Sequence, residues 1–149
     1  AAEDVCSAAR NLRELVLRLA SEGHHVVAAG DWNQAPPGID EQSFDHQSRT
    51  PTWFQRVPAG WTPAGFRWAF DRAVPSLRAT DRPYHPGENF VTVVDAFLVG
   101  PGIEILDVHT DDLGFAHTDH HPVHLRLRLT RGEEAQEPTG RPGDRSPGR

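Results

Sequence analysis

Three polar clusters lie where apolar runs of the sequence end or are interrupted. Gly30-Asp31-Trp32-Asn33 follows one apolar run, Asp95 stands inside the run Val93–Val99, and Thr118-Asp119-His120-His121-Pro122 precedes the last run. Carboxylate, amide and imidazole groups in such places can hold water, move protons and neutralise negative charge as it develops. The three clusters are therefore the candidate site of this chain.

Asp95 is the sharpest of these signals because apolar residues flank it on both sides. An aspartate in such a run is costly to bury unless it is paired or hydrogen-bonded. A histidine is its natural partner, since a carboxylate orients an imidazole and keeps it able to hold a positive charge. The alternative is that Asp95 is a structural hydrogen-bonded residue, and that the other two clusters are ordinary polar turns.

The elements that would position these clusters follow from the apolar periodicity. Residues 3–21 have apolar side chains at three- and four-residue steps with arginines on the other face, which predicts an amphipathic helix ended by Gly23. Residues 24–29 form a short apolar run between glycines, which predicts a buried strand. The candidate Asp31 and Asn33 then fall at the end of that strand.

The rest of the chain predicts further strands and one long connection. Residues 34–82 are rich in proline and aromatic residues and are expected to form a functional loop that decides the substrate, with a short helix or a short strand within 66–77. Strands are expected at 89–99, 103–108 and 123–129, and strict alternation in the last predicts one buried face. Residues 131–149 are almost free of apolar residues and are expected to be a disordered tail, which leaves one domain at 1–130.

Composition narrows the class of protein. The single cysteine, Cys6, excludes an internal disulfide and a cysteine-based zinc site, and is expected to be a small core residue. No apolar run is long enough to cross a membrane and no signal-peptide pattern opens the chain, which favours the cytoplasm. The net charge of −6 disfavours long duplex DNA as a substrate, although a bound divalent cation can reverse the sign inside an acidic pocket.

Together and in this order, the three clusters resemble the C-terminal half of the endonuclease/exonuclease/phosphatase superfamily, the DNase I-like metal-dependent phosphoesterases. The matching features are a Gly-Asp-x-Asn after a strand, an aspartate that begins a strand ending near a turn, and a Thr-Asp-His-x-Pro before a final strand. The stretch 82–99 also resembles bacterial members of that superfamily. The resemblance covers roughly residues 5–130 and depends on all three motifs together.

The resemblance implies a role for each matching residue. Asp31 matches the aspartate that orients and deprotonates the attacking water, and Asn33 matches the asparagine that holds that water or a phosphate oxygen. His120 matches the histidine that donates to a non-bridging oxygen, and Asp95 matches its partner. Asp119 matches an aspartate beside the metal, so Mg²⁺ or Mn²⁺ is the implied cofactor and a phosphoester the implied substrate.

One departure from the family is large. Its first half supplies a strand-borne asparagine, a glutamate that is the principal magnesium ligand and a central tyrosine or histidine, and nothing upstream of the helix at 3–21 supplies them here. We therefore expect an α/β (α+β) domain that is half of a four-layer α/β/β/α sandwich, mainly one mixed or antiparallel sheet with a covering helix. We also expect the isolated chain to have little or no activity without the N-terminal half.

The sequence is also compatible with other functions. The chain is alternatively an inactive truncated remnant or a binding module that depends on a partner. The dense cluster at 117–121 also suggests a zinc hydrolase of the metallo-β-lactamase kind, but that pattern needs a His-x-His and position 115 is Phe. His117, His121 and His124 are expected on the surface or behind the site. Trp53, Trp61 and Trp68 are expected to pack in the core or loops, with stacking on a substrate as the alternative, and Trp32 is expected to position Asp31 without touching substrate.

Overall fold

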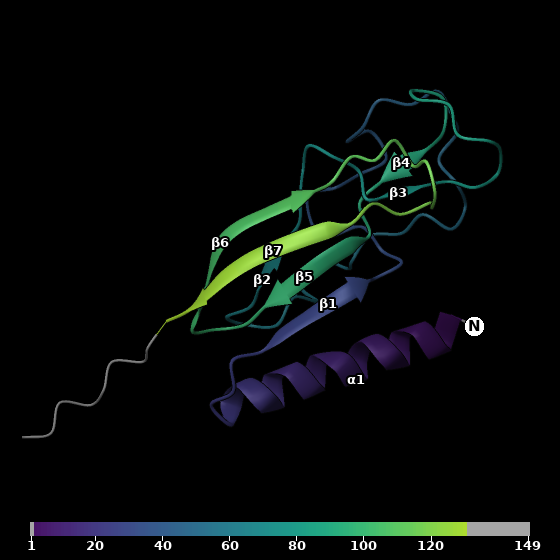
Figure 1. Ribbon diagram of the computed structural model, residues 1–149. Coiled ribbons are helices and arrows are strands. Elements are labelled where there is room, and N and C mark those ends of the chain that lie inside the picture. The colour runs from purple at the N-terminus through teal and green to yellow at the C-terminus, as the bar shows by residue number, and fades with distance from the viewer. Residues whose placement is uncertain (1, 131–149) are drawn as a thin grey trace, which may run out of the picture.

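The computed structural model describes residues 2–130, with side chains from Arg10 onward (Figure 1). The tail expected at 131–149 and the core position expected for Cys6 lie outside the described part. Within it, one helix and seven strands follow one another, and every pairing between strands is antiparallel. The fold class is thus mixed α/β with mostly antiparallel sheets, and none of its described helices could cross a membrane.

Helix α1 (Ala2–Ser21) confirms the amphipathic helix expected at 3–21. Its inner face buries Val16 against Val26, Phe66 and Leu98, and Arg10 and Arg18 are exposed on the other side. The helix ends in a glycine cap: Gly23 has a φ of 86°, and the N–H of His24 donates to the carbonyl of Leu19 over 3.0 Å. This cap turns the chain directly into the first strand.

The central sheet has the order β1 (Val27–Asp31), β5 (Asp95–Val99) and β2 (Arg67–Ala69). The prediction of a buried strand at 24–29 was wrong in two respects. The strand begins at Val27 and extends to Asp31, and most of its side chains are exposed. The physical reason is its position at an edge: β1 pairs only with β5 among the described strands, so only the side facing α1 is covered.

The single strand expected at 89–99 is broken in two. Strand β4 (Val91–Thr92) pairs with β3 (Leu77–Arg78), and β5 pairs with β1 and β2. The two residues between β4 and β5, Val93 and Val94, are 1% and 2% exposed, because the chain passes through the core as it changes partners. The open choice at 66–77 resolves as strand, since β2 and the start of β3 occupy this stretch.

Strands β6 (Ile103–Thr110) and β7 (Val123–Leu129) confirm the two strands expected at 103–108 and 123–129. They pair with each other as an antiparallel hairpin, which was not predicted, with a bulge between Ile105 and Asp107. The expectation that one face of the last strand is buried holds only for its first half. Leu125 packs against the central sheet, whereas Leu127 and Leu129 on the same face are 36% and 55% exposed.

The layers place the site at one end of the molecule. Helix α1 covers one face of the central sheet through Leu98, and the hairpin covers the other face through Val99 and Ile103. Strands β1, β5 and β7 run side by side in the view of Figure 1, with the small β3–β4 ladder near one end of the hairpin. At that end lie Asp31, Asp95 and the turn that precedes β7.

Candidate functional site

Asp31 and Asp95 stand directly opposite one another on neighbouring strands. Cross-strand partners have Cβ atoms about 4.5–5.5 Å apart, so the two carboxylates share one small region. Like charges in such a place repel unless one of them gains a positive partner. A positively charged partner beside either aspartate would relieve this repulsion.

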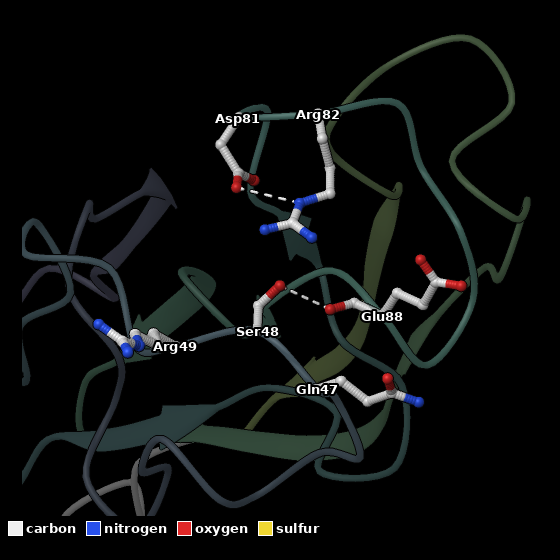
Figure 2. A pocket seen from close by; sticks show the side chains of 6 residues that line it. All are labelled: Gln47, Ser48, Arg49, Asp81, Arg82 and Glu88. Atoms are coloured by element: carbon white, nitrogen blue, oxygen red, sulfur yellow. Dashed lines mark hydrogen bonds and ion pairs between the residues drawn. The ribbon is translucent and has the colours of Figure 1, made fainter.

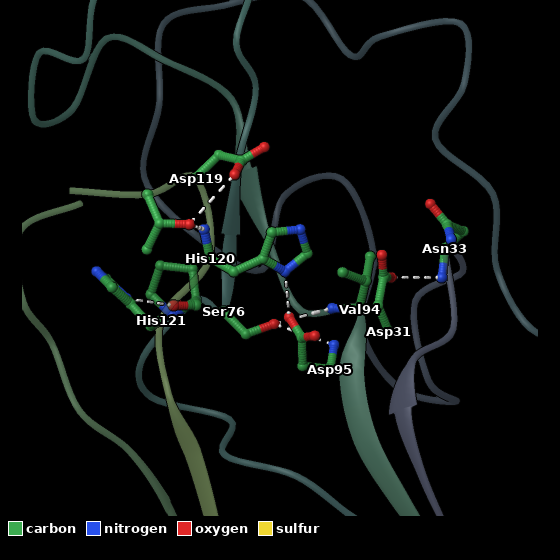
Figure 3. A network of polar contacts seen from close by, with 10 residues as sticks. Asp31, Asn33, Ser76, Val94, Asp95, Asp119, His120 and His121 are labelled. Atoms are coloured by element: carbon green, nitrogen blue, oxygen red, sulfur yellow. Dashed lines mark hydrogen bonds and ion pairs between the residues drawn. The ribbon is translucent and has the colours of Figure 1, made fainter. Parts of the chain in front are cut away.

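His120 supplies that partner. Its Nδ1 lies 2.8 Å from Oδ2 of Asp95, and their side chains are 32% and 19% exposed (Figure 3). This contact confirms the expectation that Asp95 pairs with a histidine. Because Asp95 occupies Nδ1, the other ring nitrogen, Nε2, is left to act on whatever fills the adjacent space.

The backbone fixes His120 at this distance. Segment 119–121 lies beside β3 and is joined to it by an isolated antiparallel bridge: Leu77 pairs with His120, and the N–H of Arg78 donates to the carbonyl of Asp119 over 3.0 Å. The N–H of His121 donates to the carbonyl of Ser76 over 2.8 Å. Strand β3 is thus held between β4 and this segment, which ties the histidine motif to the strand that leads into Asp95.

Ser76 is a second anchor, one that sequence reasoning missed. Its fully buried hydroxyl accepts hydrogen bonds from the N–H groups of Val94 and Asp95, each at 3.1 Å (Figure 3). These two amides lie at the break between β4 and β5, where no neighbouring strand accepts them. A single serine between Pro75 and Leu77 carries no sequence signal for this role, because the N–H groups that donate to it are 18 and 19 residues away.

The inward position of Trp32 indicates the side to which Asp31 and Asn33 point. The indole Nε1 donates to the carbonyl of Ala96 over 2.9 Å, and the ring packs 5.7 Å and 4.7 Å from the ring centres of Trp61 and Trp68. Side chains alternate along an extended segment, so the residues on either side of an inward Trp32 face the opposite way. This confirms that Trp32, Trp61 and Trp68 pack together, whereas the role of Trp32 in positioning Asp31 stays a prediction.

Asn33 has a φ of 50°, a left-handed conformation that asparagine tolerates better than most residues. Its N–H donates to Oδ1 of Asp31 over 2.8 Å, which closes a tight turn and orients the carboxylate (Figure 3). The second carboxylate oxygen of Asp31 remains available to a ligand.

One cavity of about 210 Å³ gathers the predicted residues. Asp31, Asn33, Asp119 and His120 all line it, and Asp95 lies behind His120. The cavity is smaller than the roughly 300–1000 Å³ typical of pockets that enclose a whole ligand. Its volume suits a compact group, with the remainder of a larger ligand outside.

Two of the other residues that line this cavity bear on its chemistry: Arg78 was not predicted, and Trp53 was expected to pack in the core or loops, with stacking on a substrate as the alternative. Arg78 brings a positive charge, and its Nε is buried without a hydrogen-bond partner among the described residues. Trp53, with 45% of its surface exposed, lies at the same cavity, unlike the packed Trp61 and Trp68. The one available signal for Arg78 was its position within the short run Leu77-Arg78-Ala79, the same kind of interruption that marked Asp95.

Tyr84 lies beside Arg78, but its phenol carries no negative charge that would form an ion pair with the guanidinium. Burial raises the pKa of Tyr84, the negative charge of Asp112 raises it further, and Arg78 opposes the shift. Tyr84 therefore stays a neutral phenol near neutral pH. Its ring lies 5.8 Å from the guanidinium carbon of Arg78 and packs edge-on to Phe115.

His121 is structural. Its side chain is buried, its Nδ1 lies 2.9 Å from the carbonyl of Pro75, and its Nε2 accepts the N–H of Phe115 at 3.1 Å. Because both ring nitrogens are bonded to backbone, His121 has no lone pair for a metal. Within the described residues the run 117–121 therefore does not gather into a zinc-binding cluster of the metallo-β-lactamase kind.

The cavity offers oxygen donors of the type that Mg²⁺ and Mn²⁺ prefer. The carboxylates of Asp119 and Asp31 and the amide of Asn33 line it, and Mg²⁺ commonly binds through one or two carboxylates while keeping several waters. The pocket carboxylates do not form a group of three close ligands within the described chain. The donor set fits a weakly held divalent cation.

A larger hollow elsewhere differs in chemistry. It measures about 410 Å³ and is lined by Arg49 and Arg82 together with Asp81, Glu88 and two polar residues (Figure 2). Its opposite charges balance, with Arg82 bound to Asp81 at 3.2 Å, and none of the predicted site residues lines it. It therefore has neither the surplus charge nor the acid–base pair of the smaller cavity.

Comparisons with known proteins gave no match: no family model, no curated protein and no solved structure matches this chain.

Proposed function

We propose that this chain carries the nucleophile-activating and transition-state-stabilising part of a metal-dependent phosphoester hydrolase. The observation that carries the proposal is the Asp95–His120 pair at 2.8 Å, which lies behind a small cavity that Asp31 and Asn33 also line. Phosphoester hydrolysis needs an aligned water, a base and neutralisation of charge on the equatorial oxygens. The lining residues provide each of these functions.

The proposed roles are those that the family resemblance implies, and the positions of the side chains at the cavity support them. Asn33 and Asp31 hold the attacking water, and the free carboxylate oxygen of Asp31 takes its proton. His120 donates from Nε2 to a non-bridging oxygen as negative charge accumulates on the phosphoryl group. Asp95 keeps the proton on Nδ1 and stabilises the imidazolium, and Arg78 adds a second positive charge at the same cavity.

The cofactor of this proposal is Mg²⁺ or Mn²⁺, with Asp119 as the residue that would hold it. Such an ion supplies charge neutralisation on the phosphoryl oxygens and the leaving group. The ion also resolves the repulsion among the carboxylates of Asp31, Asp95 and Asp119 in a chain whose net charge is −6. The class of phosphoester, whether nucleic acid, nucleotide or phospholipid headgroup, is set by contacts outside the cavity.

We also infer that a further segment of the same polypeptide completes the domain. The central sheet and the hairpin each have one face turned toward the other. Four residues on these two faces are nevertheless exposed, and together they define the open face: Val27 and Ala29 on β1, and Leu127 and Leu129 on β7. A hollow of about 280 Å³, lined in part by Ala29, Phe97 and Val123, opens between sheet and hairpin on this side. Additional strands here would turn the three layers into a four-layer α/β/β/α sandwich and bring further metal ligands.

The test compares this chain with a polypeptide that also carries the inferred further segment, here called the completed enzyme. We expect the chain alone to show negligible Mg²⁺-dependent hydrolysis of bis-p-nitrophenyl phosphate, because the open face and the metal shell are incomplete. The completed enzyme is expected to hydrolyse it, and EDTA is expected to abolish the activity.

The outcomes separate the two inferences. Robust turnover by the chain alone would contradict the need for a further segment while leaving the proposed chemistry in place. A folded completed enzyme that hydrolyses no phosphomonoester or phosphodiester with Mg²⁺ or Mn²⁺ would contradict the proposed function. In that case the chain is an inactive remnant or a binding module.

A further inference from the structure

A second cluster of metal-ligating side chains lies on the β6–β7 hairpin, outside the proposed hydrolase cavity. His109 and His124 are cross-strand partners in the antiparallel register. Their imidazole rings stack with centres 4.9 Å apart and planes 15° from parallel. The hairpin itself thus places two imidazoles side by side on one face.

Asp111 completes a three-residue group. One of its carboxylate oxygens lies 2.9 Å from Nε2 of His124, and the other lies 3.7 Å from Nε2 of His109. Ligand atoms of the three residues all lie within 4.8 Å of one another. Atoms bound to one tetrahedral zinc ion at about 2.0–2.1 Å stand roughly 3.3 Å apart, which the observed spacing brackets.

Asp107 orients one of the imidazoles. Its Oδ2 lies 3.1 Å from Nδ1 of His109, which places the proton on Nδ1 and leaves the lone pair of Nε2 on the side of Asp111. Histidines that bind metals commonly donate their other ring N–H to a carboxylate in this way. Two histidines that were surface neighbours by chance would not need a carboxylate to orient one of their rings.

The backbone beneath the group is held on both sides. The N–H of Asp111 donates to the carbonyl of Pro122 over 3.0 Å, and the N–H of Thr110 donates to Oδ2 of Asp71 over 2.9 Å. These bonds fix the end of β6 beside the start of β7. Little rearrangement is therefore needed to bring the three side chains onto one ion.

We propose that His109, His124 and Asp111 form a binding site for a transition-metal ion of the Zn²⁺ class. Two imidazoles and one carboxylate suit Zn²⁺, Ni²⁺ or Cu²⁺, whereas Mg²⁺ prefers oxygen ligands alone. The three side chains are 53%, 51% and 48% exposed, so water fills the remaining coordination positions. The ion would join the two strands of the hairpin next to the segment that leads to Asp119 and His120.

The experiment is a calorimetric titration of the untagged chain with ZnCl₂ near neutral pH. We expect saturable binding of one Zn²⁺ per chain, undisturbed by excess Mg²⁺. His109→Ala or His124→Ala is expected to weaken this binding at least about tenfold. Asp107→Asn is expected to weaken it about 10- to 100-fold, as is typical when the support of a ligating histidine is lost.

Two matched controls locate the site. His24→Ala removes an exposed histidine at the start of the central sheet, and His120→Ala removes the histidine of the hydrolase cavity. Both variants are expected to bind Zn²⁺ as the unaltered chain does. Absence of saturable binding, or binding lost with His120 and retained without His109 and His124, would overturn the proposal, and circular dichroism of each variant verifies that the fold is intact.

Discussion

Asp31→Asn is expected to lower kcat of the completed enzyme for bis-p-nitrophenyl phosphate by about 100- to 10,000-fold, the range contributed by a positioned general base. Asparagine has the same shape, and its Oδ1 can still accept the N–H of Asn33 that closes the turn. It cannot take a proton from water. Steady-state kinetics at saturating Mg²⁺ measure the effect.

A measurement of unfolding checks that the Asp31→Asn variant is still folded. The substitution removes a negative charge directly opposite Asp95, so urea unfolding of the chain is expected to show unchanged or slightly higher stability. Asp45→Asn, at an exposed position outside the cavity, is the matched control and is expected to keep full activity. A wild-type rate in Asp31→Asn would remove the base from the proposed mechanism.

His120→Ala is expected to lower kcat by about 100- to 1000-fold, the usual cost of losing one preorganised donor to a developing charge. The effect should appear in kcat more than in KM, because the bond to the non-bridging oxygen strengthens as charge accumulates in the transition state. The measurement is again steady-state kinetics of the completed enzyme.

The partner of His120 makes this prediction sharper. Asp95→Asn is expected to slow the reaction as well, since asparagine cannot stabilise the imidazolium. If Asp95 acts through His120, the double variant should be no slower than His120→Ala alone. Fully additive losses would show that the 2.8 Å contact does not work as a unit in the reaction.

The sequence predicted the proximity of the candidate residues better than it predicted the strands around them. Asp95 could be identified because a charge inside an apolar run must find a partner, and that partner proved to be His120. The helix and the two strands β6 and β7 were predictable because their periodicity is local and long. These features need no knowledge of what packs against them.

The missed features depend on contacts between distant parts of the chain. Strands β3 and β4 have two residues each, which is too short for any alternation to appear. Ser76 acts only because the break between β4 and β5 lies beside it. The exposure of β1 and of Leu129 depends on how many neighbouring strands cover them. An apolar run has the same sequence pattern at the edge of a sheet as at its centre, so the sequence does not reveal this exposure.

The histidine pair on the hairpin was missed for a related reason. His109 and His124 are 15 residues apart in the chain and become neighbours only through the register of β6 with β7, which includes a bulge. A shift of one residue would turn every side chain beyond it to the other face. Sequence spacing alone could not supply that register.

The central claim is that Asp31, Asn33 and His120 surround one space of phosphate size. The most direct test is an NMR titration of the isotopically labelled chain with inorganic phosphate in the presence of Mg²⁺, compared with chloride at equal ionic strength. The proposal predicts that the amides of Asp31 and Asn33 and the imidazole of His120 shift along one common saturation curve, and that His120→Ala weakens the response at Asp31 and Asn33. Signals that do not move, or that respond at separate concentrations, would contradict it.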